Sequence, residues 1–135
     1  AELKQELKAF ISGLGHECVD FGGDDPIYAN TAVRLAKAVA AGECDRGVLI
    51  CGTGIGVSIA ANKVKGAYAA LVNNVYQAQR AELSNHANII TLGAQVTGAE
   101  LAKCLVAAYL KEEFDPQSRS APKVRRICEY ENGID

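Results

Sequence analysis

Residues 49–63 read Leu49-Ile50-Cys51-Gly52-Thr53-Gly54-Ile55-Gly56-Val57-Ser58-Ile59-Ala60-Ala61-Asn62-Lys63. This order predicts a buried strand, then a glycine loop, then the start of a helix. The alternate glycines Gly52, Gly54 and Gly56 let backbone N–H groups approach a ligand closely. A loop that leads into a helix N-terminus in this way attracts anions, and it favours the thiolate form of a nearby cysteine. The segment therefore supplies a candidate base, Cys51, beside a candidate oxyanion site.

Helices and strands are predicted to alternate on both sides of this segment. Apolar residues at helical spacing predict helices at 2–14, 32–41, 57–63, 75–83, 98–110 and 123–131. Short apolar runs predict strands at 16–21, 47–51, 67–72 and 88–92. This alternation is typical of one α/β domain, residues 1–135, with a doubly wound parallel sheet. Ligands of such sheets bind at the carboxyl ends of the strands, which is where Cys51 is expected.

The start of the chain departs from this architecture. The chain opens at Ala1 directly in a helix, whereas a doubly wound domain normally opens with a strand. We therefore expect a first strand and its loop to lie upstream of Ala1.

Composition excludes several classes of protein. The net charge of −2 favours neither nucleic acid nor a membrane surface as partner. No apolar stretch approaches the roughly 20 residues of a membrane span, and no signal peptide opens the chain. Five cysteines at wide spacing, without a C-x-x-C pair, disfavour a disulfide framework and a zinc site. Reduced thiols in a cytoplasmic protein are expected, with Cys18 and Cys104 as small core residues.

The glycine loop does not match the common nucleotide-binding motifs. A dinucleotide fingerprint would need Gly or Ala at Val57 or Ile59, and a Walker loop would need a Gly-Lys-Ser/Thr ending. A nucleophilic hydrolase would need a histidine partner, for which His86 is the better placed of two. A thiolate general base needs only a lowered pKa and donors for the oxyanion that it creates. Proton abstraction next to a carbonyl fits this inventory, and a tight turn with packing glycines is the alternative.

A second signal comes from the basic tail. Arg119 and Lys123 are four residues apart and share a face if this segment is helical. Two cations on one face suit a phosphate group, whereas an ordinary solvated basic patch is the alternative.

Two longer segments carry a resemblance to a known family. They read Asp45-Arg46-Gly47-Val48-Leu49-Ile50-Cys51-Gly52-Thr53-Gly54-Ile55-Gly56 and Ala87-Asn88-Ile89-Ile90-Thr91-Leu92-Gly93. Together with 58–64 they closely resemble the ribose-5-phosphate isomerase B and galactose-6-phosphate isomerase family, and 13–22 looks like that family's second strand. The resemblance implies a Rossmann-like fold, a homodimer or tetramer with active sites shared between subunits, and no metal or cofactor.

The same resemblance implies roles for single residues. Cys51 would be the base that moves a proton between C1 and C2 of a phosphorylated sugar through a cis-enediolate, and Thr53 would handle the substrate oxygens. The other implied substrate-binding residues are Tyr28, Gly52, Gly54, Ile55, Gly56, Ser84, Asn85, Arg119 and Lys123. Of these, the loop N–H groups would hold the enediolate, Asn85 would come from the partner subunit, and Arg119 and Lys123 would bind the phosphate.

Departures from the family pattern bear on the substrate. The family's ring-opening histidine falls on Ser84, one arginine falls on Gln95, and one phosphate-binding arginine is Lys123. A tetrose 4-phosphate cannot close a furanose ring, because its O4 carries the phosphate, and so it needs no ring-opening acid. Residues 81–85 and 119–121 also look similar to the tetrulose-4-phosphate isomerase branch.

Several alternatives stay open from the sequence alone. A tetrulose 4-phosphate and ribose 5-phosphate are both possible substrates, and His86 is a possible replacement for the missing histidine. The chain could instead be a non-catalytic or half-site subunit of a hetero-oligomeric isomerase. A nucleotide-binding module would be stabilised by NAD or ATP and not by sugar phosphates.

Overall fold

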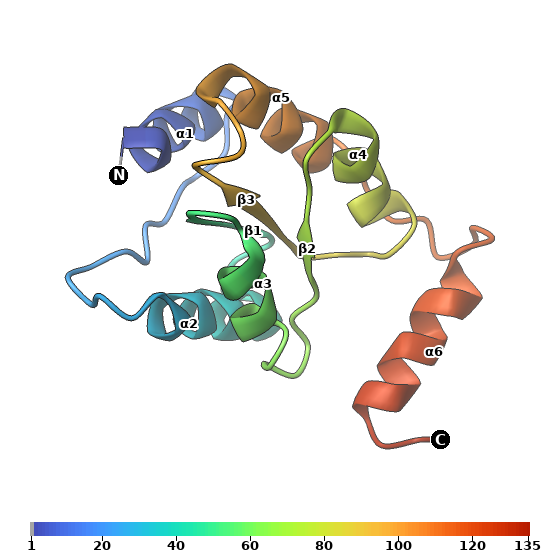
Figure 1. Cartoon of the computed structure of the whole chain (residues 1–135). Coiled ribbons are helices and arrows are strands. Elements are labelled where there is room, and N and C mark those ends of the chain that lie inside the picture. Colours follow the sequence, from blue (N-terminus) through green and yellow to red (C-terminus); the bar gives the residue numbers. More distant parts are fainter. Residues whose placement is uncertain (1) are drawn as a thin grey trace.

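The computed structural model of the chain describes residues 2–135 and has three parallel strands at its centre (Figure 1). The strands are β1 (Gly47–Cys51), β2 (Ala69–Leu71) and β3 (Ile89–Gly93), in the order β1-β3-β2. All five residues of β3 are buried, because it lies between the other two strands. The register sets Cys51 beside Gly93, so the carboxyl ends of β1 and β3 meet at one edge of the sheet.

Helices cover both faces of the sheet, as the doubly wound prediction requires. They are α1 (Glu2–Gly13), α2 (Tyr28–Ala40), α3 (Ile55–Ala61), α4 (Val75–Leu83), α5 (Ala99–Leu110) and α6 (Ala121–Glu131). Figure 1 shows α1, α4 and α5 on one face, α2 and α3 on the other, and α6 outside both layers. No helix of residues 2–135 is both long enough and apolar enough to span a membrane.

Each face of the sheet has its own core, because successive residues of a strand point to opposite sides. Ile90 and Leu92 pack with Leu105 and Tyr109 under α4 and α5. Leu49 and Ile89 pack with the other core cluster, under α2 and α3. Cys51 lies against this second cluster, so its side chain points to the face covered by α3.

Apart from the strand at 16–21, the predicted elements are confirmed with small shifts, and the start of α2 moves most. β1 and α4 have the predicted bounds. α3 begins at Ile55, directly after Gly54, whose φ of +82° sets the turn into the helix. α2 begins at Tyr28, four residues before the predicted start at 32. The side chain of Asp25 accepts hydrogen bonds from the Ile27 N–H and the Asn30 amide at this point, which apolar spacing alone cannot reveal.

Two predictions are wrong. Residues 16–21 form no strand, since no strand of residues 2–135 pairs with them, and the side chain of Val19 is 57% exposed. An alternating pattern becomes a strand only where a neighbour completes the hydrogen-bond ladder. Cys104 is exposed on the outer side of α5 and is not a core residue, and Cys18 is half-buried. Cysteine is small enough for a buried or an exposed position, so the residue type alone does not predict which side of the helix Cys104 takes.

Candidate active site

Cys51 ends β1 with its sulfur in the mouth of the glycine loop. The Gly54 N–H donates to Cys51 Sγ over an N···S distance of 3.1 Å. Burial by itself would raise the pKa of the Cys51 thiol, but backbone N–H groups of the loop outweigh burial and hold the pKa below its usual range. These N–H groups belong to Val57, Gly54, Thr53 and Gly56. The donors that the sequence predicts for an anion therefore surround the sulfur and favour its thiolate form.

Gly54 is the residue on which the loop's shape depends. A Cβ atom there would lie 2.6 Å from Leu71 Cδ1 and 2.9 Å from the carbonyl carbon of Leu92, and the φ of +82° disfavours any side chain. The Gly54 carbonyl accepts a hydrogen bond of 2.8 Å from the buried hydroxyl of Thr91 in β3. The next turn is closed by the Ile55 N–H, which donates to Thr53 Oγ1 at 3.2 Å. The loop is therefore fixed to the central strand.

Two residues of this site were missed by sequence reasoning. Thr91 supplies the hydroxyl that ties down the loop, and Gly93 gives the loop room, because a Cβ atom there would lie 2.6 Å from the Thr53 carbonyl. A signal for Thr91 was present, since it is the only hydroxyl-bearing residue in the apolar run 89–92. Gly93 shows no such signal, because its role depends on a contact with a segment forty residues away.

Tyr28 and Gln95 flank the loop. The Tyr28 phenol from the start of α2 fills the place where a side chain on Gly56 would lie, so it packs on the first turn of α3. The Gln95 amide follows β3 and lies 3.6 Å from the position of a Cβ atom on Gly52. The structure thus brings Tyr28 together with Cys51, Thr53 and the loop glycines, and it adds Gln95 to them.

The other predicted site residues lie at the opposite end of the sheet. Ser84 and Asn85 follow α4 and precede β3, so they lie at the amino ends of the strands. Arg119 lies in the turn before α6, and Lys123 lies in the first turn of that helix, both exposed. A five-residue strand is about 15 Å long, so this group and Cys51 are separated by the length of the sheet. One chain by itself does not bring the two groups together.

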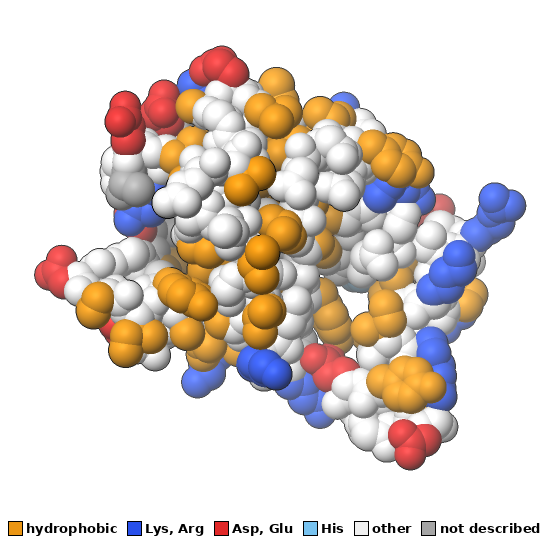
Figure 2. All heavy atoms as spheres, in the orientation of Figure 1, with side chains coloured by type: hydrophobic (Ala, Val, Ile, Leu, Met, Phe, Trp, Pro, Cys, Tyr) orange, Lys and Arg blue, Asp and Glu red, His pale blue; other side chains and the backbone are white. Residues whose placement is uncertain are grey.

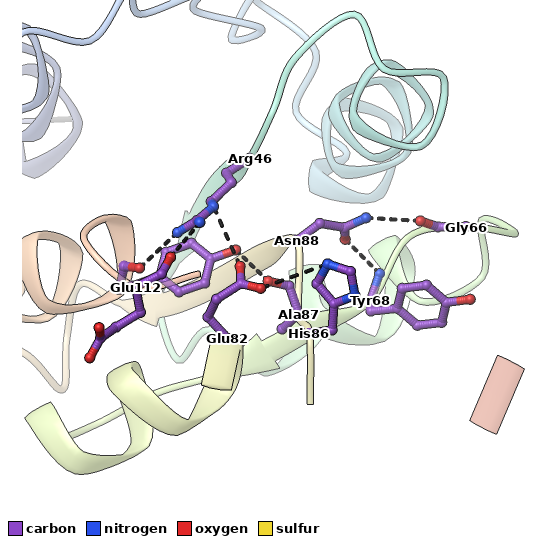
Figure 3. Close-up of polar contacts among 9 residues, drawn as sticks. Arg46, Gly66, Tyr68, Glu82, His86, Ala87, Asn88 and Glu112 are labelled. Carbon is purple, nitrogen blue, oxygen red and sulfur yellow. Dashed lines mark hydrogen bonds and ion pairs between the residues drawn. The ribbon is translucent and has the colours of Figure 1, made fainter. Parts of the chain in front are cut away.

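His86 is held in a network at this far end, as Figure 3 shows. Its ring stacks on Phe114 with the ring centroids 4.5 Å apart, and its Nε2 lies 3.8 Å from the carboxylate of Glu82. Glu82 is 3% exposed and pairs with Arg46 at 3.4 Å. Burial raises the pKa of the Glu82 carboxyl, and the charges of Arg46 and His86 oppose that shift. His86 therefore braces the turn next to Asn85 and does not reach Cys51 of its own chain.

Ser84 also has a local partner. It caps the end of α4, and its hydroxyl accepts a hydrogen bond of 2.6 Å from Arg80 Nε. The Ser84 side chain, which the resemblance aligns with a ring-opening histidine, is thus engaged by a residue of α4.

The chain matches known proteins over nearly its whole length. Residues 1–127 match the family model described as Ribose/Galactose Isomerase. The chain is 51% identical over 131 residues to the D-erythrulose-4-phosphate isomerase 2 of Mycolicibacterium smegmatis, an alignment that covers 96% of this chain and 86% of that protein. It is 44% identical to the D-erythrulose-4-phosphate isomerase of Pectobacterium atrosepticum, over 97% of this chain and 88% of that protein.

A solved structure gives the same picture. The ribose-5-phosphate isomerase B of Clostridium thermocellum matches with a TM-score of 0.92 and 44% identity, and the match covers 98% of this chain and 90% of that one. The agreement extends over nearly the whole chain, so the fold is that of these Rossmann-like proteins.

Proposed function

The chain belongs to the ribose/galactose isomerase family, and we propose that residues 1–135 act as one domain that interconverts a tetrulose 4-phosphate and the corresponding aldotetrose 4-phosphate. The observation that carries the isomerase proposal is the place of Cys51 at the carboxyl end of β1, where its sulfur accepts a hydrogen bond from the Gly54 N–H of the glycine loop. The loop N–H groups also lower the pKa of the Cys51 thiol, which makes more of the thiolate base available at a given pH.

The reaction needs one base and one set of donors. The Cys51 thiolate takes the proton from the carbon next to the substrate carbonyl, and the electron pair left behind moves onto the carbonyl oxygen. A cis-enediolate results, and the loop N–H groups stabilise its oxyanion. Cys51 then returns the proton to the neighbouring carbon. The Thr53 hydroxyl meanwhile passes a proton from the hydroxyl oxygen of the enediolate, which becomes the new carbonyl oxygen, to the former carbonyl oxygen.

The arrangement of the donors suits this shuttle. Before proton transfer the negative charge is on Cys51 Sγ, and after it the charge is on a substrate oxygen close to the same loop. The N–H groups of Thr53, Gly54 and Gly56 therefore lie near the charge in both states. Because Gly54 is fixed to Thr91, these donors keep their positions during the reaction.

A tetrulose 4-phosphate is favoured over a pentose by two observations. Ser84 stands where the family has its ring-opening histidine, and its hydroxyl is bound by Arg80. A substrate whose O4 carries phosphate stays open-chain and needs no acid at that position. In addition, two relatives at 51% and 44% identity are D-erythrulose-4-phosphate isomerases.

We expect proton NMR in D2O to show solvent exchange and product formation with D-erythrulose 4-phosphate, at a kcat/KM about tenfold or more above that with ribose 5-phosphate. The two substrates are compared under the same conditions. Faster turnover of ribose 5-phosphate would contradict the tetrulose assignment. Exchange with neither sugar would favour the half-site subunit, and thermal stabilisation by NAD or ATP alone would favour a nucleotide-binding module.

The proposed site includes a second copy of the chain. Asn85, Arg119 and Lys123 lie too far from Cys51 of their own chain to share a substrate with it. Next to Cys51, the side chains of Ile55 and Ile59 are 52% and 57% exposed on one face of α3. Figure 2 shows apolar side chains in a run over α3, and basic side chains gathered over α6. A second copy that covers the α3 face would bring its Asn85 and α6 to the Cys51 loop.

A complementation experiment tests the shared site. Cys51→Ala and Arg119→Ala chains are each expected to be weakly active alone. When they are mixed, unfolded and refolded together, a heterodimer has one site with both residues intact and one with neither. About half of the dimers are mixed, so about a quarter of the wild-type activity is expected to return. Mixing that restores no activity, with mixed dimers shown by mass spectrometry, would contradict sharing between subunits.

A further inference from the structure

A small polar cluster joins α6 to the rest of the molecule, and we call it the α6 latch. It consists of Glu131 and Cys128 on α6 and of Gly66 and Tyr68 on the segment before β2. The Tyr68 hydroxyl donates to Glu131 Oε1, and the Gly66 N–H donates to Glu131 Oε2 at 3.1 Å. Tyr68 Oη also lies 3.3 Å from Cys128 Sγ. Both carboxylate oxygens of Glu131 are therefore bound by the body of the protein.

The segment that carries Gly66 and Tyr68 is itself held in place by hydrogen bonds. Figure 3 shows Asn88 bridging the segment: its Nδ2 donates to the Gly66 carbonyl at 2.9 Å, and its Oδ1 accepts from the Tyr68 N–H at 2.8 Å. Asn88 directly precedes the buried strand β3. Burial, followed by the neighbouring Cys128 and Glu131, raises the pKa of the Tyr68 hydroxyl, so it stays protonated and remains a donor.

Little else holds α6 in place. Ala121 is the only residue of α6 that is buried. A cavity of about 380 Å³ and another of about 260 Å³ separate the helix from the body, and Val124 and Cys128 line both. The smaller cavity is also lined by Asn85. The angle of α6 about its own axis is therefore set mainly by the latch.

This angle decides where Lys123 points. Lys123 is five residues before Cys128 and eight before Glu131, which places it about 140° and about 80° around the helix from these two latch residues. With the latch closed, Lys123 is exposed, on the helix that follows Arg119. A rotation of α6 would turn this cation away from whatever it binds.

We propose that Tyr68 and Glu131 are positioning residues, which fix α6 so that Lys123 and Arg119 hold the substrate phosphate in the active site of a second copy. This inference rests on the proposed function. Neither residue touches the substrate; they act through α6. Loss of the latch should therefore weaken substrate binding and leave proton transfer at Cys51 unchanged.

The test compares Tyr68→Phe and Glu131→Gln with a matched control, Glu129→Gln. Glu129 is also on α6, but its carboxylate pairs with Arg126 on the same helix at 2.8 Å. Each latch variant is expected to raise KM for D-erythrulose 4-phosphate about fivefold with kcat within about twofold, and to speed amide hydrogen exchange in α6 about tenfold but not in β3. The control is expected to change none of these quantities.

Binding is also measured without turnover, by calorimetry of D-erythrulose 4-phosphate in the Cys51→Ala background, where the latch variants should raise Kd about fivefold. Three results would overturn the positioning role: unchanged hydrogen exchange in α6, an unchanged Kd, or an equal effect of Glu129→Gln. A Cys51→Ala chain that binds no sugar phosphate would overturn it as well. A wild-type enzyme that binds this sugar phosphate without isomerising it would instead overturn the proposed function, while the Kd values still decide the role of the latch.

Discussion

Replacement of Cys51 by alanine is expected to lower kcat about 10³-fold while the fold and the binding of sugar phosphate persist. A positioned general base typically contributes about 10² to 10⁴ in rate, and no other side chain in the loop can take a proton from carbon. The Thr53 hydroxyl is too weak a base, and the ring of His86 is engaged by Phe114 and Glu82. Binding is expected to persist because the loop donors are backbone N–H groups, and because Arg119 and Lys123, the cations proposed to bind the phosphate, lie outside the loop. Steady-state kinetics, thermal unfolding and calorimetry measure the three quantities.

Cys44→Ala is the matched control for this substitution. Cys44 is also a half-buried free thiol, and it packs against the same core cluster under α2 and α3. Its loss should leave kcat within about twofold, because no step of the reaction uses it. A Cys51→Ala enzyme that keeps more than about a tenth of the wild-type kcat would place the base elsewhere.

Gly54→Ala is expected to lower both stability and activity strongly. A left-handed backbone costs an alanine about 1–2 kcal/mol, and the clash with Leu71 and the Leu92 carbonyl adds about 1–3 kcal/mol. The loop must also shift, which takes the Gly54 N–H away from Cys51 Sγ. We expect the pKa of the Cys51 thiol to rise and kcat/KM at neutral pH to fall about 10²-fold. Urea unfolding and enzyme kinetics measure these changes.

The same loss of N–H donors to Cys51 can be measured from the pH dependence of thiol alkylation. Only the thiolate reacts, so the rate at Cys51 falls as the pH drops through its pKa. In the wild type this fall should come at a lower pH than for a cysteine in a model peptide, because the loop lowers the pKa. In Gly54→Ala the midpoint should move to higher pH. Gly98→Ala is the control, since the φ of Gly98 is −69° and a Cβ atom there meets nothing within 4 Å. An unshifted midpoint in Gly54→Ala would contradict the role of the loop.

The sequence predicted best those features that depend on neighbouring residues. The strand, glycine loop and helix at 47–61 follow from a local pattern, and the structure has all three. The predicted strand at 16–21 failed because a strand depends on a partner, which local alternation cannot supply. The helix after Arg119 was expected, but Arg119 itself lies in the preceding turn and only Lys123 is helical. The four-residue spacing predicted that both cations lie on one helix, but this holds for Lys123 and not for Arg119.

The candidate site shows the same division between local and distant contacts. Cys51 and its loop could be found from the sequence, since the donors lie within six residues of the sulfur. The contacts that Thr91 and Gly93 make with the loop could not, because they cross the fold; only the hydroxyl of Thr91 within an apolar run hinted at one of them. Asn85 and Lys123 lie at one end of the sheet and Cys51 lies at the other, and no sequence motif specifies this separation. The latch between Tyr68 and Glu131 joins residues 63 positions apart and was likewise invisible.

The hydrogen bond from Thr91 to the Gly54 carbonyl has a consequence for the speed of the chemistry. It ties the donor loop to β3, a strand with all five residues buried. In the proposed mechanism, peptide dipoles held in this way do not reorient when charge moves from sulfur to oxygen, whereas water around a free thiolate would have to reorient in every turnover. The free-energy cost of orienting these dipoles is incurred once, when the chain folds. The packing of the sheet and the height of the proposed catalytic barrier are therefore coupled through one threonine hydroxyl.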